Sequence, residues 1–323
     1  MYKYEDIEYV HLELTERCQA SCPMCPRTNN PLITNAELSL NDIKKIFSID
    51  FIKKLKGIKL CGNYGDPLAA KDCLDIIKYF KKHNSNICFG IGTNGGLRNS
   101  TWWKDLAETI NDNGSHVAFG IDGLQNTNHL YRIGVDWKIL MNSVKTFIEN
   151  GGKARWDYLV FSHNDHQIEE AKQMSIDMGF VDFNLKRTNR ITSRYKGKLK
   201  QSEKYSHDIV KKIENLNLDL INISCKAKNK KEIYISAEGL LFPCCWVGNG
   251  INISFKNREQ IWDLVVNKDL INTKILGIEY VMNCGFLDEI ENSWNKKSIL
   301  SGKLKTCALM CNIEHDLHRS QFL

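Results

Sequence analysis

The sequence has no apolar run long enough to cross a membrane, for which a helix needs about 18 or more consecutive apolar residues. Its first ten residues, MYKYEDIEYV, carry acidic side chains where a secretory signal peptide would have a basic start and an apolar core. From these two absences we expect a cytoplasmic protein that has no membrane partner.

The sequence also lacks a strong excess of either charge. The formal net charge is +6, and lysine-rich surfaces are commonly only solvated, so charge alone does not favour a nucleic-acid partner. With 323 residues, 42% of them hydrophobic and 25% charged, the composition is that of a soluble globular protein. The length suits one large domain or two moderate ones.

Cysteine, by contrast, is abundant. The chain has 12 cysteines, and in a reducing cytosol they would rarely form disulfides. Clustered cysteines in such a protein more often bind metal or take part in redox chemistry. Of the twelve, Cys61, Cys73 and Cys88 fall within expected strands or helices. We expect these three to be buried, inert thiols.

The first part of the chain alternates between β-type and helical patterns. The β-type runs are Tyr9–Leu14, Ile58–Cys61, Ile87–Gly92, Val117–Ile121, Trp156–Phe161 and Val181–Lys186. A capping box at Ser39 and Asp42 begins one of the intervening helical stretches, and Gly151 and Gly179 end two others. Such alternation predicts parallel strands with right-handed crossovers, in either an open doubly wound sheet or a full or partial barrel.

The pattern changes after Lys186. Residues 187–204 are polar and basic, and a helical stretch through about Leu220 follows. Residues 232–243 predict a hairpin that turns at Gly239. We therefore expect a boundary between about 190 and 222, with one domain over residues 1–205 and a linker helix and second domain over 206–323.

Three cysteines directly follow the first β-type run. Cys18, Cys22 and Cys25 have the spacing C-x3-C-x2-C. Three thiolates from one loop suit three irons of a [4Fe–4S] cluster, and the absence of a fourth leaves one iron open for a ligand that takes part in the reaction. A zinc site completed by a distant residue and buried free thiols are the alternatives.

This spacing and position resemble the signature of the radical S-adenosylmethionine (SAM) superfamily. Three further segments, each after a β-type run, resemble family motifs: Gly62–Pro67, Thr93–Gly95, and Gly120–Gly123 followed by Arg132. Two residues depart from the family pattern. Met24 replaces the usual aromatic residue before the third cysteine, and Asp66 replaces the usual glutamate.

The resemblance implies a partial (β/α)6, TIM-like barrel with its active site at the C-terminal ends of the strands. It implies reductive cleavage of SAM on the [4Fe–4S] cluster, giving a 5′-deoxyadenosyl radical that abstracts hydrogen from a substrate C–H bond. An external electron donor such as flavodoxin or ferredoxin would reduce the cluster. The implied cofactor-binding residues are Met24, Gly65, Asp66, Thr93, Asn94, Asp122 and Arg132.

A second cysteine group lies near the C-terminus. Cys225, Gly239 and Cys244 form C-x13-G-x4-C, which resembles the opening of the SPASM and twitch domains that follow many radical SAM barrels. With Cys307 and Cys311, the resemblance implies a small α+β, cysteine-rich domain of the twitch type that holds an auxiliary [4Fe–4S] cluster. Four cysteines also suit a structural zinc ion, which stays an alternative.

The reaction and the substrate stay open at this point. We expect oxidation or crosslinking of a small molecule, sugar, nucleotide or peptide, assisted by the auxiliary cluster. The alternatives are an epimerase that uses Cys245 or Cys284 as hydrogen donor, a peptide- or tRNA-modifying enzyme, and a zinc-binding nucleic-acid or interaction protein. Arg187 and Arg190 either contact an anionic group of the substrate or lie in a solvated linker.

Overall fold

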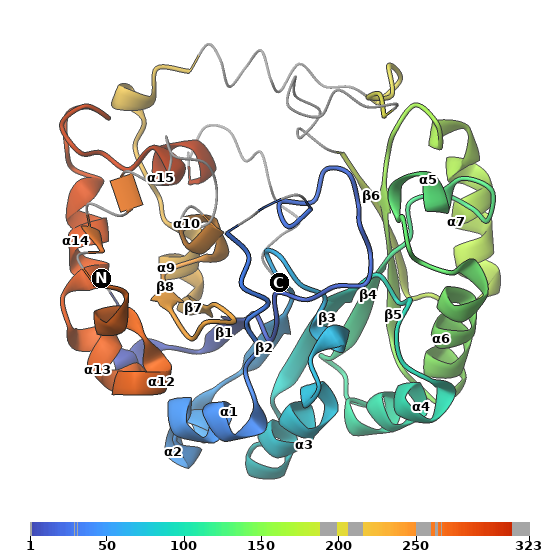
Figure 1. The fold of residues 1–323 in the computed structure, drawn as a ribbon, viewed down its shortest axis with the longest axis horizontal. Helices are drawn as coiled ribbons and strands as arrows, with labels where there is room; N and C mark the ends of the chain where they lie inside the picture. Colours follow the sequence, from blue (N-terminus) through green and yellow to red (C-terminus); the bar gives the residue numbers. More distant parts are fainter. Residues whose placement is uncertain are drawn as a thin grey trace.

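The computed structural model describes residues 2–28, 30, 32–187, 199–205, 216–249, 260–261, 264–265 and 267–311. Within these residues the strands form one eight-stranded sheet in the order β6-β5-β4-β3-β2-β1-β7-β8 (Figure 1). The strands are β1 Tyr9–Leu12, β2 Gly57–Leu60, β3 Cys88–Thr93, β4 His116–Gly120, β5 Ala154–Leu159, β6 Asp182–Lys186, β7 Glu232–Ile235 and β8 Leu241–Phe242.

The first six strands pair in parallel in their sequence order. Each overlaps one of the six predicted β-type runs, so that part of the prediction is confirmed. The sheet curves around a central space and is not closed, because β6 and β8 are its two edges (Figure 1). The architecture is therefore a partial barrel, as the family resemblance implied, and not an open doubly wound sheet.

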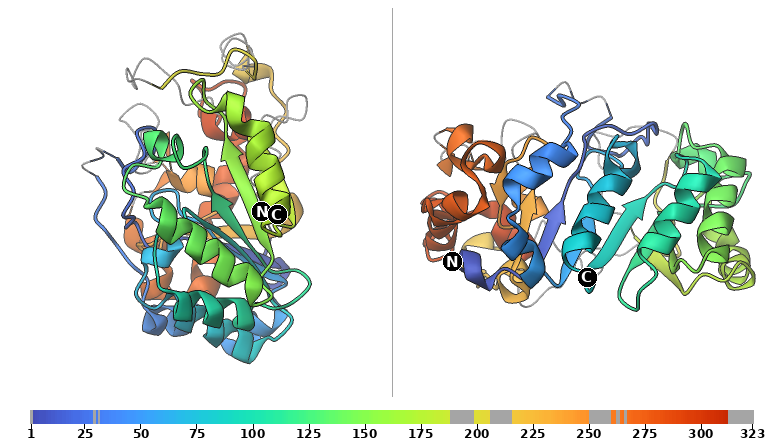
Figure 2. Two further views of the ribbon diagram at one scale, coloured as in Figure 1. Left: turned by 90° about the vertical axis from the view of Figure 1, so that its right-hand side faces the viewer. Right: turned by 90° about the horizontal axis from the view of Figure 1, so that it is seen from below.

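Helices cover the outer side of the sheet (Figures 1 and 2). They are α1 Leu40–Ile46, α2 Ile49–Lys54, α3 Cys73–His83, α4 Ser100–Thr109, α5 Asn128–Tyr131, α6 Trp137–Glu149 and α7 Ile168–Asp177. The capping box of Ser39 and Asp42 begins α1 as predicted. Gly151, with φ of +87°, follows the end of α6 in a conformation that glycine adopts without strain.

The main core lies between the strands and these helices. Apolar side chains alternate with polar or small ones along most of the parallel strands, and the apolar set faces the helices. Phe119 on β4, for example, packs against Trp103 of α4 and Phe147 of α6, and all three side chains are fully buried. The other set of positions consequently faces the inside of the barrel.

The C-terminal part of the chain extends the same sheet. β7 pairs in parallel with β1, and β8 pairs antiparallel with β7, around a turn at Gly239 with φ of +89°. The predicted hairpin is thus confirmed. The helices α9 Lys226–Lys230, α10 Cys245–Asn249, α12 Thr273–Leu276, α13 Ile278–Asn283, α14 Phe286–Ser293 and α15 Lys305–Met310 gather at this end of the sheet (Figure 2).

The predicted linker helix falls mostly on residues 206–215, which lie outside the described residues. Its described end holds only a short 3-10 turn, Leu218–Leu220. The division into domains 1–205 and 206–323 stays a prediction. Among the described helices, none has the length and apolar character needed to span a membrane.

Candidate active site

The loop that carries the first three cysteines, residues 15–28, leaves the C-terminal end of β1 at the mouth of the barrel (Figure 1). We call it the cysteine loop. The amide of Asp66 donates to the Arg17 carbonyl at 2.9 Å, and the amide of Ser21 donates to the Ile133 carbonyl at 2.8 Å. The loop is therefore held by the segments that follow β2 and β4.

Within the cysteine loop, the Cys22 thiol interacts with the thiols of Cys18 and Cys25. Cys22 is buried, and Cys18 and Cys25 are partly buried. Burial, together with the nearby Asp66 carboxylate, raises the pKa of Cys18 to about 12, and the thiols of Cys22 and Cys25 interact with their neighbours in the loop. A bound cation would offset the cost of ionising these thiols, because the thiolate is the form that binds metal.

An unpartnered donor lies in the same loop. Arg27 Nε is buried and has no hydrogen-bond partner among the described residues, and the guanidinium lowers the pKa of Cys18. The side-chain amide of Asn94 also donates to Cys18 Sγ, at 3.4 Å. Three thiolates with N–H donors beside them fit a [4Fe–4S] cluster, whose sulfurs accept such bonds.

Asp66 connects the loop after β2 with the loop after β3. Its buried carboxylate accepts hydrogen bonds from the Leu68 amide (3.0 Å), Thr93 Oγ1 (2.9 Å), the Asn94 amide (2.8 Å) and Asn94 Nδ2 (2.7 Å). Burial is the largest influence on its pKa and raises it. A carboxylate has room for about four such bonds, so Asp66 here positions the Thr93–Asn94 turn beside Cys18. The predicted contact between Asp66 and the amino group of SAM stays a prediction.

Gly65 allows the closest approach between these loops. A Cβ at this position would lie 1.8 Å from the Thr15 carbonyl oxygen. The neighbouring amides of Tyr64 and Gly65 donate to Glu13 Oε1 at 2.8 and 3.3 Å. Any larger residue at position 65 would push the cysteine loop away from the strand ends.

Asp122, which is buried, and Arg132, which is partly exposed, form an ion pair. Arg132 Nε lies 2.6 Å from Asp122 Oδ2, and the Leu159 amide donates to Asp122 Oδ1 at 2.7 Å. The guanidinium lies across Gly120, where a Cβ would be 2.3 Å from Nη2, and it also interacts with the Cys22 thiol. Met24, also predicted to bind cofactor, is buried.

The inside of the barrel is polar. Lys186 on β6 pairs with Asp157 on β5 at 2.5 Å, and both side chains are partly exposed. Cys61, at the end of β2, interacts with Lys59 and Lys186, and its sulfur would lie 3.2 Å from a Cβ placed on Gly92. Small residues on β3 and β4 thus leave space in front of cationic groups from β2 and β6.

The C-terminal cysteines come together at the other end of the sheet. Cys225, Cys244, Cys307 and Cys311 are all buried. A hydrogen bond with Cys311 and burial raise the pKa of Cys225, while Cys244 interacts with Cys307 and Cys311. The amide of Lys228 donates to Cys225 Sγ at 3.4 Å.

A second unpartnered donor lies beside this group. Trp294 Nε1 is buried and makes no well-formed hydrogen bond among the described residues. It lies next to Cys307, and the indole N–H lowers the pKa of this thiol, which burial raises to about 12. Four thiols with such donors fit a second cluster. Within the described part of the chain, no three His, Cys, Asp or Glu residues form a group that could hold a single metal ion.

The remaining cysteines differ in their surroundings. Cys73 is buried as predicted, but Cys61 and Cys88 are only partly buried, so the prediction for them is wrong. Cys61 faces the polar barrel interior, and Cys88 is the first residue of β3. Cys245 is buried beside Lys59 and Cys61, whereas Cys284 is exposed.

A family model that matches half of the chain identifies the family. A model described as "Radical SAM superfamily" matches residues 12–174. The chain belongs to the radical SAM superfamily. Members of this superfamily use a [4Fe–4S] cluster and SAM, so the chain is a radical SAM enzyme, as the sequence predicted.

Solved radical SAM structures share the fold. SuiB of Streptococcus suis bound to S-adenosylmethionine has a TM-score of 0.57 at 18% identity, over 93% of this chain and 77% of that one. Native anSMEcpe with bound AdoMet has a TM-score of 0.58 at 15% identity, over 94% and 93%. A GTP 3′,8-cyclase of Campylobacter jejuni is 24% identical in an alignment of 287 positions that covers 78% of this chain and 85% of the relative.

Several site residues were missed by the sequence analysis. Glu13, Lys59, Asp157, Lys186 and Tyr234 occupy inward-facing positions of the barrel strands. Strands of a parallel sheet that is covered on both faces are apolar almost throughout. Polar residues at alternate positions of these strands would therefore have indicated a polar barrel interior. Of the basic segment, Arg187 is exposed and Arg190 lies outside the described residues.

Proposed function

We propose that this radical SAM enzyme holds its cluster on Cys18, Cys22 and Cys25 and acts on a substrate bound inside the barrel, between this cluster and an auxiliary [4Fe–4S] cluster on Cys225, Cys244, Cys307 and Cys311. When bound, the first cluster and SAM supply reductive cleavage to a 5′-deoxyadenosyl radical that takes hydrogen from a C–H bond. The auxiliary cluster supplies an acceptor for a second electron, so the net reaction is an oxidation or a crosslink.

The observation that carries this proposal is a buried N–H donor beside each of the two cysteine groups. Arg27 Nε lies in the cysteine loop, and Trp294 Nε1 lies beside Cys307. A buried N–H group without a partner costs free energy, so Arg27 Nε indicates an acceptor that belongs at that place, while the Trp294 N–H is directed at the Cys307 sulfur. Cluster sulfurs are acceptors of this kind.

The chain's own residues bind and orient the reactants. Arg132, fixed by Asp122 beside Cys22, is placed to meet the carboxylate of SAM. Asn94, fixed by Asp66, supports Cys18.

The substrate carries an anionic group. Support comes from Lys59 and Lys186, which bring two ammonium groups toward the barrel interior from β2 and β6. The GTP 3′,8-cyclase relatives indicate a nucleotide, and the SuiB structure bound to precursor peptide SuiA indicates a peptide as the other class. Phosphate groups pair with lysine more strongly than a neutral peptide does, which favours the nucleotide.

The test of the two clusters is a count of iron and sulfide in protein purified without oxygen. The wild type should hold about eight irons, and the variant with Cys225, Cys244, Cys307 and Cys311 changed to Ala about four. The matched control, Cys73→Ala/Cys88→Ala, should keep the wild-type content. Zinc in place of iron at the C-terminal cysteines would refute the auxiliary cluster.

Epimerisation is a second candidate function, because Cys245 lies buried beside Cys61 and Lys59 at the barrel interior. In that case the Cys245 thiol would return a hydrogen atom to the substrate radical. Cys245→Ala should then abolish product formation but keep SAM cleavage, while Cys284→Ala, at an exposed position, should change neither. Normal turnover by Cys245→Ala would exclude this candidate.

A further inference from the structure

A buried lysine lies close to the second cysteine group. Lys303, two residues before α15, is 4% exposed, and its Nζ donates to the carbonyls of Asp219 and Ile221 at 2.7 Å each. Among the described residues, no carboxylate forms an ion pair with this ammonium group. The two carbonyls are neutral and take two of its three N–H donors, so one donor and the charge remain for a further partner.

This lysine lines a cavity of about 470 Å³. The lining consists of residues 219–223, residues 294–296 and Lys303. Lys296, which is exposed, adds a second cation. Asp219 supplies the one carboxylate of the lining, and this carboxylate accepts a hydrogen bond from the Ile299 amide at 2.7 Å. The lining therefore carries two ammonium groups and one carboxylate.

The burial of Lys303 costs free energy unless a negative charge offsets it. A buried ammonium group loses its hydration, and hydrogen bonds to neutral carbonyls replace only part of it. Lysine side chains are almost never fully buried unless they are paired. An oxyanion in the cavity supplies both a negative charge and an acceptor for the third N–H. Asn222 and Asn295 also line the cavity, and their amide groups are donors that suit further oxygens of the same ligand.

We infer that this cavity, which we call the Lys303 cavity, binds a small oxyanion, a carboxylate or phosphate group, on the Lys303 ammonium. Its volume is that of a site for a small molecule. The inference goes beyond the proposed function, because it needs neither the clusters nor SAM. The ligand would lie next to the second cysteine group, since Trp294 lines the cavity and its N–H is directed at the Cys307 sulfur.

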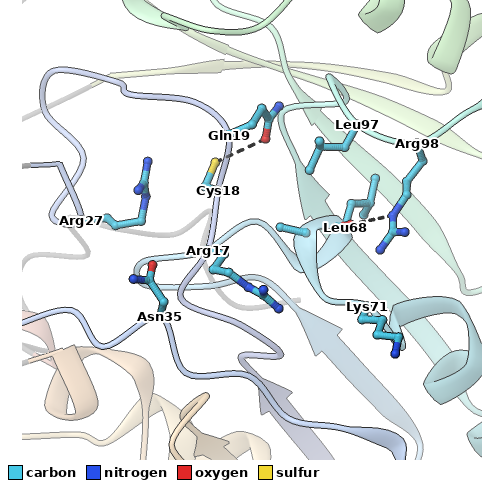
Figure 3. Close-up of a pocket in the computed structure, with 10 residues that line it drawn as sticks. Arg17, Cys18, Gln19, Arg27, Asn35, Leu68, Lys71, Leu97 and Arg98 are labelled. Atoms are coloured by element: carbon cyan, nitrogen blue, oxygen red, sulfur yellow. Dashed lines mark hydrogen bonds between the residues drawn. The ribbon is translucent and has the colours of Figure 1, made fainter.

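A second cavity with several cations lies beside Cys18, and its cations are in a different state. It has a volume of about 540 Å³, and its cations include Arg17, Lys71 and Arg98 (Figure 3). We call it the cationic cavity. Arg17 pairs with Glu37, Arg98 donates to two backbone carbonyls, and Lys71 is exposed to water. An anion bound there would not depend on Lys303, so variants of the Lys303 cavity separate the two places.

The test is the binding of inorganic phosphate and of acetate to the anaerobic holoenzyme, measured by the NMR linewidths of the two anions. Lys303→Met keeps most of the side-chain length but removes the charge, and it should weaken binding by about tenfold or more. Lys296→Glu should weaken binding about fivefold, because it places a like charge at the cavity. The matched control is Lys297→Glu, at an exposed residue outside the lining. It should bind within about twofold of the wild type at physiological salt, which screens charges beyond about 8 Å.

Lys296→Glu decides the question even where Lys303→Met does not fold, because it changes only an exposed side chain. A loss of affinity confined to phosphate would identify a phosphate group as the ligand, and a loss confined to acetate would identify a carboxylate. Equal affinities of wild type, Lys303→Met and Lys296→Glu for both anions would overturn the inference and leave Lys303 as a tether for residues 219–221. Failure of the wild type to bind either anion would overturn it as well.

Discussion

The Tyr234 hydroxyl donates a hydrogen bond to the Glu13 carboxylate in the buried part of the barrel. Glu13 follows β1 and Tyr234 lies on β7, so the bond joins the start of the chain to its C-terminal hairpin. Asn63 Nδ2 donates to the Tyr234 oxygen at 3.1 Å and to the Cys245 carbonyl at 2.9 Å. Three segments far apart in sequence thus meet just after the C-terminal end of β1.

Tyr234→Phe should lower the free energy of unfolding by about 1–3 kcal/mol, because it leaves the buried Glu13 carboxylate without one of its donors. Urea unfolding under anaerobic conditions measures this change. Tyr280→Phe, which removes a hydroxyl from a side chain that is 54% exposed, is the matched control and should have almost no effect. Equal stability of Tyr234→Phe and the wild type would show that the bond contributes little.

The ionisation of Glu13 should make stability depend on pH. Burial raises the pKa of Glu13 to about 7, although the Tyr234 hydrogen bond lowers it. In the unfolded chain Glu13 has the ordinary glutamate pKa of about 4.3. Between these pH values the folded state binds more protons, so its free energy of unfolding falls as the pH rises.

Glu13→Gln removes this contribution and leaves a residue of similar size. The difference in free energy of unfolding between wild type and variant should decrease by about 1.4 kcal/mol per pH unit across that window. Urea titrations at pH 5 and pH 7 measure it. Parallel profiles for the two proteins would mean that Glu13 keeps an ordinary pKa in the folded state.

Gly65→Ala should abolish cluster binding. The added methyl group would lie 1.8 Å from the Thr15 carbonyl oxygen, so the cysteine loop must move away from the β2 loop. Iron content after anaerobic reconstitution is the measurement. Gly285→Ala, where no atom lies within 4 Å of the added Cβ, should keep its iron and lose only about 1 kcal/mol of stability from its positive φ.

Arg132→Gln should raise the Kd for SAM by about tenfold or more, because it removes a charge that pairs with a carboxylate. Asp122→Asn keeps the guanidinium and an acceptor for the Leu159 amide, so its effect should be smaller. Isothermal titration with SAM compares the two variants. Equal losses would mean that Arg132 acts only through the ion pair that organises the loop.

Local patterns in the sequence predicted the strands, the helices and the first cysteine group well. The capping box at Ser39 and the positive-φ glycines that follow helices are decided within a few residues, so neighbouring residues are enough to predict them. The spacing of Cys18, Cys22 and Cys25 is likewise a property of one loop.

Contacts across long stretches of sequence were not predictable in this way. The pairing of β7 with β1 and the contact of Tyr234 with Glu13 depend on where the C-terminal hairpin joins the sheet. The cationic cavity brings together Arg17, Lys71 and Arg98 from three loops, and no spacing in the sequence relates them.

The most direct test of the central claim is the formation of 5′-deoxyadenosine from SAM by anaerobic, dithionite-reduced protein. The wild type should form it, and Cys18→Ala/Cys22→Ala/Cys25→Ala should form none while keeping about four irons at the C-terminal cysteines. The same amount of 5′-deoxyadenosine from the triple variant, or none from an iron-loaded wild type, would contradict the account.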